Sequence, residues 1–471
     1  MNEEEIYYMS ACEMAEKIKT QELTSLEITE VIIKRIKEIN PLINAYCTTT
    51  FELAREMAIE ADERVKKNED IPLLNGVPTS IKDLELIKGV RTTFGSKIFE
   101  NYFPSEDSIV VKRLKEAGCV ILGKTNTPEF GFKGVTDNLI FGATLNPWNL
   151  EKTSGGSSGG AAASVVCGMG PIAQGSDGGG SIRHPACFCG AYGLKPSLGR
   201  VPIYPRKPSP ITNLSVIGPI TRYVSDAALM LDVIKGPFEG DRFSLPKDSA
   251  NYFAHINETP NKLKIGYSLN LGYAKIINNE IEKAIIKSVY KFESLGWNVE
   301  EVKFQGIDPS VAFSTHWLIN LGYSLEPYLD EWKDKIDPLL VFWAETGLKS
   351  SSLLPDAMKI RNEFYYSIFE SFKNYDILIT PTTTVPAFEI GIAAPTSIEG
   401  VDVGPTGWQP FTFPFNFTGH PAASIPCGWA SNNLPIGMQI VAKRFEELLI
   451  LQVSKAFEEL APWQDKKPLF N

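Results

Sequence analysis

A glycine-rich segment in the first half of the chain carries a serine suited to act as a nucleophile. Ser181 follows three consecutive glycines within Ser176–Arg183. Backbone N–H groups in such a loop can converge on one point, which suits the oxyanion that forms when a serine attacks a carbonyl group. A glycine-rich turn with a capping serine has the same composition. Taken alone, this segment leaves both interpretations open.

A lysine is the candidate base for this serine. Lys82 stands at the end of residues 77–82, whose composition predicts a strand. A lysine at the end of a strand is usually solvated. A buried lysine differs, because desolvation lowers its pKa and leaves it neutral. A neutral lysine can serve a serine nucleophile without any histidine.

Histidine and metal chemistry find little support in the sequence. The four histidines are His184, His255, His316 and His420, and no pair has the His-Glu-x-x-His or His-x-x-x-His spacing of zinc ligands. His184 lies three residues after Ser181. It is a candidate substrate contact or rival base, but a packed structural histidine is the commoner case. We therefore predict neither a metal site nor a cofactor.

A second serine motif suggests a different enzyme class. Residues 155–159 match the Gly-x-Ser-x-Gly nucleophile elbow of an α/β-hydrolase, with Ser157 at the centre. His316 or His420 would then be the distal base. The elbow follows a buried strand, whereas the polar residues 149–154 predict a loop. This missing context argues against an esterase-like hydrolase.

The elements that would position these residues alternate between helices and short strands, which indicates α/β layering. We expect helix starts at Ser10 and Thr24-Ser25 and a helix stop at Asn40-Pro41. Residues 264–302 predict a βαβ-like unit, and residues 305–372 are helical and rich in aromatics. The patterns predict helices over 6–40, 51–68, 107–117, 161–168 and 279–295, and strands over 77–82, 119–122, 264–267, 297–302 and 377–379.

Composition excludes several classes of protein. The 471 residues are 43% hydrophobic, which is enough to bury a core. A net charge of -10 without a basic tract disfavours nucleic acid and anionic membranes as partners. No apolar run approaches the ~20 residues of a membrane span. The odd count of seven cysteines and an acidic N-terminus without a signal-peptide pattern predict a cytoplasmic protein.

Together, the serine and lysine segments closely resemble the amidase signature family. The resemblance runs from about residue 10 to 460, and several motifs in the right order are more specific than any single one. It implies an α/β amidase signature fold with a large mixed β-sheet covered by helices on both faces. The matching segments are 76–83, 122–126, 146–149, 155–160, 175–183, 193–196, Gly218-Pro219 with Arg222, and 434–439.

The resemblance also assigns roles to residues. The nucleophile of the family's Ser–cis-Ser–Lys triad corresponds to Ser181, the bridging serine to Ser157 and the base to Lys82. The cis peptide bond would be Gly156–Ser157. The reaction implied is hydrolysis of an amide through an acyl-enzyme. The family's oxyanion hole corresponds to the backbone of Gly178, Gly179, Gly180 and Ser181, and its supporting residues to Ser158, Asp177 and Arg183.

The same resemblance implies one amidase signature domain over residues 1–471. Residues 1–70 would form N-terminal helices and residues 71–235 the signature core. Residues 236–380 would be a more variable helical region that shapes the substrate pocket, and residues 381–471 would return to the core.

A separate motif bears on the branch of the family. The A subunit of the tRNA-dependent amidotransferase carries Ser-Ser-Leu-Asp-Gln before its Gly-Pro, whereas residues 212–217 replace Asp-Gln by Ser215-Val216. This change argues against glutaminase work on tRNA, which stays an alternative. A non-catalytic scaffold protein is a further alternative. The presence of all three triad residues speaks against it, because a scaffold would need none of them.

Free-standing amidases of the family act on hydrophobic, aryl or ω-amino-acyl amides. Residues 408–416 fall where such enzymes line the acyl pocket, although an aromatic run also suits a core. We expect a small-molecule amide with a hydrophobic or aromatic acyl group as substrate, and a possible homodimer.

Overall fold

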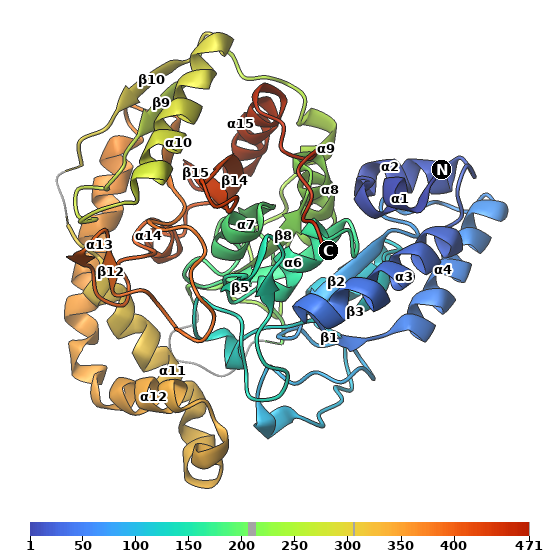
Figure 1. Cartoon of the computed structure of the whole chain (residues 1–471), viewed down its shortest axis with the longest axis horizontal. Helices are drawn as coiled ribbons and strands as arrows, with labels where there is room; N and C mark the ends of the chain where they lie inside the picture. The colour runs from blue at the N-terminus through green and yellow to red at the C-terminus, as the bar shows by residue number, and fades with distance from the viewer. Residues whose placement is uncertain (206–212, 305–306, 471) are drawn as a thin grey trace.

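A mixed β-sheet organises the chain, whose computed structural model describes residues 1–205, 213–304 and 307–470 (Figure 1). Thr212 of the branch motif and residues 305–306 of the expected helical region lie outside the described residues. Within the described part, the sheet has eleven strands in the order β1-β3-β2-β6-β8-β7-β14-β15-β11-β9-β10. In that order the strands span Tyr46–Thr49, Val120–Thr125, Pro78–Lys82, Ile172–Asp177, Val216–Thr221, Tyr192–Lys195, Ala422–Trp429, Pro435–Ala442, Ile377–Pro381, Lys264–Tyr267 and Asn298–Glu301.

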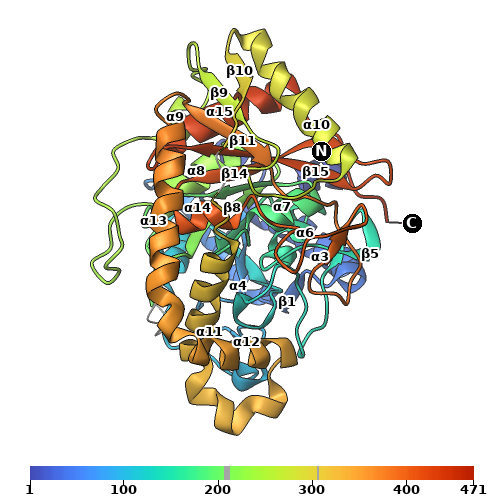
Figure 2. The same ribbon diagram turned by 90° about the vertical axis from the view of Figure 1, so that its left-hand side faces the viewer.

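Helices cover both faces of this sheet, as Figures 1 and 2 show. The expected fold class is therefore confirmed. The alanine-rich α6 is buried along its whole length and packs against β2, β3, β6 and β8. The helices are α1 Glu3–Tyr8, α2 Ala11–Lys19, α3 Ser25–Ile43, α4 Phe51–Lys66, α5 Ile109–Glu116, α6 Gly159–Val166, α7 Arg183–Cys189, α8 Val224–Ile234, α9 Tyr252–His255, α10 Asn279–Val289, α11 Ser310–Trp332, α12 Pro338–Lys349, α13 Leu354–Ser371, α14 Phe413–Phe417 and α15 Glu447–Leu460.

The pairing of the central strands sets the place of the candidate site. β2 pairs in parallel with β3 on one side and with β6 on the other, and β6 pairs antiparallel with β8. Lys82 and Asp177 are the last residues of β2 and β6. Because parallel neighbours end at the same edge of a sheet, these two residues lie close together.

The N-terminal helix signals are mostly confirmed. The side chains of Ser10 and Thr24 accept hydrogen bonds from N–H groups in the first turns of α2 and α3, so both serve as N-caps. The expected stop at Asn40-Pro41 is wrong, because α3 continues to Ile43. Ile43 is fully buried, and this packing outweighs the backbone hydrogen bond that a proline in the last turn removes.

Residues 149–154, expected to be a loop, include a short strand. β5 (Asn149–Thr153) pairs with β4 (Leu145–Asn146) in a two-stranded sheet apart from the large one. Its middle residues are exposed or half-buried. The buried strand of the central sheet that a nucleophile elbow requires is therefore still missing before Ser157. A second small sheet joins β12 (Ser397–Ile398) and β13 (Val401–Asp402).

The βαβ-like unit is confirmed, since β9 and β10 are parallel neighbours. The helix expected over 279–295 ends as α10 at Val289, and a 3-10 turn continues from Tyr290 to Leu295. The aromatic region that follows forms α11, α12 and α13, which stand together at one side of the molecule (Figure 2).

α11 and α12 approach each other closely because glycines lie at their contact. A Cβ on Gly347 of α12 would lie 1.8 Å from the carbonyl oxygen of Leu318 on α11. A Cβ on Gly322 of α11 would lie 2.8 Å from the carbonyl oxygen of Ala344. Backbone atoms stand in the way at both positions, so neither glycine can be enlarged unless the helices move apart.

We expect Gly347→Ala to lower the free energy of unfolding by about 1–3 kcal/mol through overpacking. By helix propensity alone, replacing a glycine by alanine in an exposed helix would raise the free energy of unfolding by about 1 kcal/mol. The sign of the measured change therefore tells overpacking apart from helix propensity. Denaturant unfolding measures it, with the exposed Lys349→Ala on the same helix as control. An unchanged or raised midpoint for Gly347→Ala would contradict the close contact.

Candidate active site

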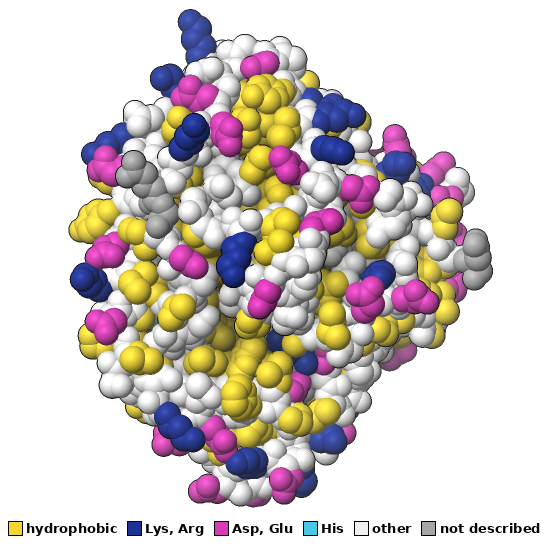
Figure 3. Space-filling model, turned by 60° about the vertical axis from the view of Figure 1, so that its left-hand side comes forward, with side chains coloured by type: hydrophobic (Ala, Val, Ile, Leu, Met, Phe, Trp, Pro, Cys, Tyr) yellow, Lys and Arg dark blue, Asp and Glu magenta, His cyan; other side chains and the backbone are white. Residues whose placement is uncertain are grey.

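A cavity of about 520 Å³ opens at the edge of the sheet where β2 and β6 end. Ser157, Ser176, Gly178 and Ser181 line one part of it. Figure 3 shows hydrophobic side chains gathered around a hollow on the side of the molecule that carries α11 to α13. The rest of the cavity lining is mostly apolar, including Leu84, Phe99, Tyr102, Phe130, Trp317 and Tyr328.

Lys82 is fully buried at the end of β2. Its Nζ lies 2.7 Å from Ser157 Oγ, 2.8 Å from Ser158 Oγ and 3.1 Å from Ser176 Oγ. Burial lowers the pKa of Lys82 to about 7, against the opposing pull of nearby carboxylates. The expectation of a buried lysine with a lowered pKa is thus met. Near neutral pH, a large share of this amine is unprotonated and able to accept a proton.

The peptide bond before Ser157 is cis, as the resemblance implied. Gly156 fits here because a Cβ would lie 2.5 Å from the carbonyl carbon of Val135. Ser158, the next residue, donates its backbone N–H to the carbonyl oxygen of Ser181 (3.1 Å). This bond ties the segment of Ser157 to the segment of Ser181. The two serine side chains are not hydrogen-bonded to each other within the described chain.

Ser181 lies in the loop between β6 and α7, is 9% exposed and lines the cavity. The backbone of this loop departs from the expected oxyanion hole at one residue. The N–H of Gly180 donates to Asp177 Oδ1 (2.7 Å), so it is not available to a substrate. The N–H groups of Gly178, Gly179 and Ser181 have no acceptor among the described residues. Three donors therefore remain instead of four.

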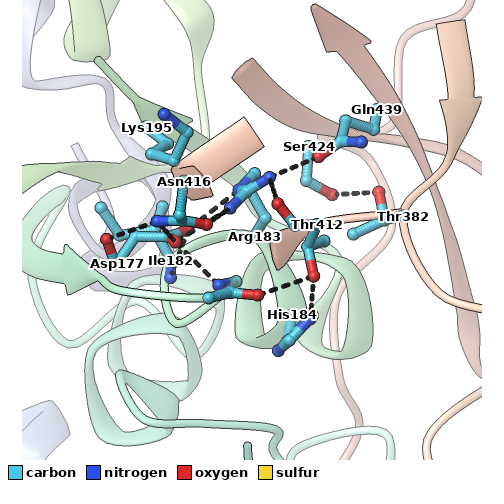
Figure 4. A network of polar contacts seen from close by, with 12 residues as sticks. Asp177, Ile182, Arg183, His184, Lys195, Thr382, Thr412, Asn416, Ser424 and Gln439 are labelled. Carbon is cyan, nitrogen blue, oxygen red and sulfur yellow. Dashed lines mark hydrogen bonds and ion pairs between the residues drawn. The ribbon is translucent and has the colours of Figure 1, made fainter. Parts of the chain in front are cut away.

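A buried ion pair stands behind the loop (Figure 4). Asp177 and Arg183 are both fully buried, and two guanidinium nitrogens of Arg183 each lie 2.9 Å from a carboxylate oxygen of Asp177. Burial alone would raise the pKa of the Asp177 carboxyl, but Arg183 holds it well below its ordinary value. Asp177 stays ionised and holds the N–H groups of Gly180 and Ile182.

Sequence reasoning missed four polar residues of this neighbourhood. Ser176 is a third hydroxyl partner of Lys82. Asn416 and Gln439 accept hydrogen bonds from Arg183 (2.6 and 2.7 Å), and the backbone carbonyl of Thr412 does so too (2.8 Å). Gln439 lies in the matching segment 434–439, which was a usable signal. Thr412 and Asn416 lie in segment 408–416, which was considered only as pocket or core, and they meet Arg183 only through the fold.

The histidines do not supply a base for Ser157. His316 contacts Met358 and His420 contacts Thr418, and neither lines the cavity. His184 is buried and contacts Thr412 Oγ1 (2.6 Å). Burial lowers its pKa to about 3, so the ring is neutral at physiological pH. The described residues contain no cluster of three or more side chains that could hold a metal ion.

The aromatic segment 408–416 belongs to the core and not to the acyl pocket. Trp408 and Phe411 are almost fully buried and do not line the cavity. Of the two interpretations that the sequence left open for this segment, its burial and its absence from the cavity lining favour the core. The apolar wall comes instead from α11 and from residues 94–102 and 130. In the described part of the chain, no helix is long and apolar enough to span a membrane.

Comparison with known proteins places the chain in a family. The Amidase family model matches residues 27–451. An acylamidase of Rhodococcus erythropolis is 35% identical, covering 99% of this chain and 98% of that protein. The A subunit of the glutamyl-tRNA(Gln) amidotransferase of Carboxydothermus hydrogenoformans is 37% identical, covering 98% and 99%. The crystal structure of a bacterial aryl acylamidase superposes with a TM-score of 0.91 at 32% identity, covering 97% of both chains. The chain therefore belongs to the amidase signature family of amide hydrolases.

Proposed function

We propose that this enzyme is a free-standing amidase that hydrolyses a small carboxylic amide through an acyl-enzyme on Ser181. The observation that carries the proposal is the buried Lys82. Its amine has a pKa lowered to about 7 and hydrogen-bonds to Ser157, which lines the same cavity as Ser181. A bridging hydroxyl and a nucleophile thus face one apolar space, and the buried proton acceptor contacts the bridging hydroxyl from behind.

The proposed reaction passes protons along this row. Neutral Lys82 accepts the proton of Ser157, which accepts the proton of Ser181 as its hydroxyl rotates toward Ser157. The Ser181 oxygen attacks the amide carbon, and the C–N bond breaks as the relay returns a proton to the leaving amine. Water then repeats the sequence in reverse and releases the acid. The proton that leaves with the amine is replaced by one from the water, whose hydroxyl stays on the acid, so the enzyme ends unchanged.

The negative charge of the tetrahedral intermediate would be stabilised by backbone donors. The free N–H groups of Gly178, Gly179 and Ser181 are the candidates, while Asp177 and Arg183 hold the loop from behind. Backbone donors that are fixed in advance stabilise an oxyanion without reorganisation during the reaction, and losing one typically lowers the rate by about 10²–10³.

The apolar wall of the cavity supports a substrate with a hydrophobic, aryl or ω-amino-acyl group. Trp317 is central to this wall, since a Cβ on Gly178 would lie 2.9 Å from its ring. Its indole N–H donates to the carbonyl oxygen of Phe132 (3.1 Å), which fixes the ring across the cavity. The name of the Rhodococcus relative, an acylamidase, agrees with this substrate class.

A second candidate function is that of the A subunit of a tRNA-dependent amidotransferase, and the identity to the Carboxydothermus protein favours it. The replacement of Asp-Gln by Ser215-Val216 speaks against it. Ser215 lines the cavity, and its hydroxyl would lie 3.0 Å from a Cβ on Gly178. A hydroxyl at this position cannot form an ion pair with the ammonium group of glutamine as a carboxylate can. An esterase-like elbow reaction finds less support, because no histidine reaches Ser157.

We expect a fluorophosphonate probe to label Ser181, and Ser181→Ala or Lys82→Ala to lower kcat/KM for an amide by at least about 10³-fold. Peptide mass spectrometry locates the adduct, and initial rates measure the loss. Ser164→Ala is the matched control, since Ser164 is a buried serine on α6 that does not line the cavity. An adduct on Ser157 would restore the nucleophile elbow instead.

The rate should rise with pH. Lys82 acts only when neutral, so kcat/KM should increase about tenfold per pH unit below the pKa near 7 and level off above it. Initial rates with one uncharged amide between weakly acidic and alkaline pH measure this. A profile without slope in that range would argue against a lysine base.

Acyl preference tests the apolar wall. The wild-type enzyme should turn over hexanamide or benzamide with a higher kcat/KM than acetamide, and Trp317→Ala should change this ratio several-fold because it removes the fixed ring. Trp332→Ala is the control, because Trp332 is half-buried on the same helix but does not line the cavity. A preference for acetamide in the wild-type enzyme would refute the hydrophobic pocket.

A further inference from the structure

The polar network in Figure 4 includes a contact chain that the proposed relay does not use. The ring of His184 and the hydroxyl of Thr412 point toward one another beneath the glycine loop, with Nε2 and Oγ1 2.6 Å apart. The same hydroxyl lies 2.8 Å from the carbonyl oxygen of Gly179. His184 and Thr412 are buried, so solvent does not compete for these bonds.

The chemistry of the partners sets the direction of these bonds. A carbonyl oxygen only accepts, and that of Gly179 is nearer to the Thr412 hydroxyl (2.8 Å) than that of Gln409 (3.4 Å), so the hydroxyl donates its single proton to Gly179. The hydroxyl then accepts from the Nε2–H of His184, which places the ring proton on Nε2. With its pKa lowered to about 3 by burial, His184 keeps this neutral form at physiological pH. The ring therefore acts as a fixed donor and not as a base.

One peptide unit of the loop is thereby held at both ends. The Gly179–Gly180 peptide has its carbonyl oxygen on Thr412 and its N–H on Asp177 Oδ1 (2.7 Å). A peptide unit is planar, so two opposite hydrogen bonds fix its rotation. The N–H groups of the two adjoining peptides, those of Gly179 and Ser181, are among those left without acceptors in the described structure.

The histidine ring also supports the loop by contact. A Cβ on Gly180 would lie 2.2 Å from the ring of His184, and the φ of Gly180 is +139°, a conformation that suits glycine. On its other side the ring packs against Trp408, with ring centroids 4.6 Å apart. The imidazole thus fills the space between the core and the loop.

We propose that His184 and Thr412 are positioning residues, which hold the Gly179–Gly180 peptide so that the N–H groups of Gly179 and Ser181 face the developing oxyanion. The inference rests on the proposed Ser181 chemistry. It assigns to His184 a role that is neither base nor substrate contact. It also gives residue 412, more than two hundred residues downstream, a part in the reaction.

The test is Thr412→Val, which keeps the shape and removes the hydroxyl. We expect kcat to fall about tenfold or more with KM for the same amide within about twofold, because the lost orientation matters most in the transition state. Binding of a trifluoromethyl ketone analogue of the substrate should weaken by a similar factor. Thr412→Ser should restore most of the rate. The midpoint of the pH profile should not move, since Lys82 is untouched.

A double-mutant cycle adds a readout that a general loss of stability does not give. His184→Gln and Thr412→Val act through the same peptide, so the double variant should lose little more than the worse single one. Thr382→Val is the control for losing a buried threonine hydroxyl, since Thr382 bonds to Ser424 (2.8 Å) away from the loop. Its kcat should stay within about twofold of the wild-type value.

Three results would overturn the inference: wild-type kcat in Thr412→Val, a loss confined to KM, or a Thr412→Ser variant as slow as the valine variant. A shifted pH midpoint in His184→Gln would make the histidine a base instead. If Thr412→Val does not fold, the serine variant and His184→Gln decide by the same measurements. Wild-type protein that hydrolyses no amide and gives no Ser181 adduct would refute the proposed function itself.

Discussion

An amine buried among hydroxyl groups is the constraint on which the site depends. The three hydrogen-bond acceptors that the described structure gives Lys82 Nζ are all serine oxygens. Hydroxyls satisfy the amine without supplying the negative charge that would keep it protonated. The contrast with Lys124 on the adjacent β3 is direct, because that buried lysine has Asp83 at 3.2 Å as an ion-pair partner. The same residue type, one strand away, is structural in one place and suited to proton transfer in the other.

The ion pair of Asp177 and Arg183 is the second fixed point, and it gathers distant parts of the chain. Arg183 begins α7, and its hydrogen bonds reach Asn416 on α14 and Gln439 on β15. A buried pair is costly unless its remaining hydrogen bonds are satisfied, and these partners satisfy them. The C-terminal part of the chain therefore adds β14 and β15 to the sheet and also supplies side chains that support the loop before α7.

The polar groups and the apolar wall of the cavity come from different layers. β2, β6 and α6 place the polar groups, and close packing of small residues leaves them little freedom. The apolar wall comes largely from α11, which reaches the site through Trp317 and packs on α12 through glycines. The two layers meet where Trp317 and Phe313 of α11 pack against Gly178 and Gly179 of the loop.

The sequence by itself determined the family, the two helix caps at Ser10 and Thr24 and the three candidate residues of the relay, because local motifs in a fixed order carry that information. The prediction failed at the end of α3, because the packing of Ile43 carries the helix past Pro41. It also failed at β5, because the polar residues of β5 form a strand only by pairing with β4. It left open whether the aromatic segment 408–416 lines the pocket or fills the core, and burial in the folded chain favours the core. Only the tertiary structure decided that the N–H of Gly180 donates to Asp177 and that the hydroxyl of Thr412 donates to the carbonyl oxygen of Gly179. The first bond depends on the exact course of the glycine loop, and the second joins residues more than two hundred positions apart, which only the packing of the whole chain brings together.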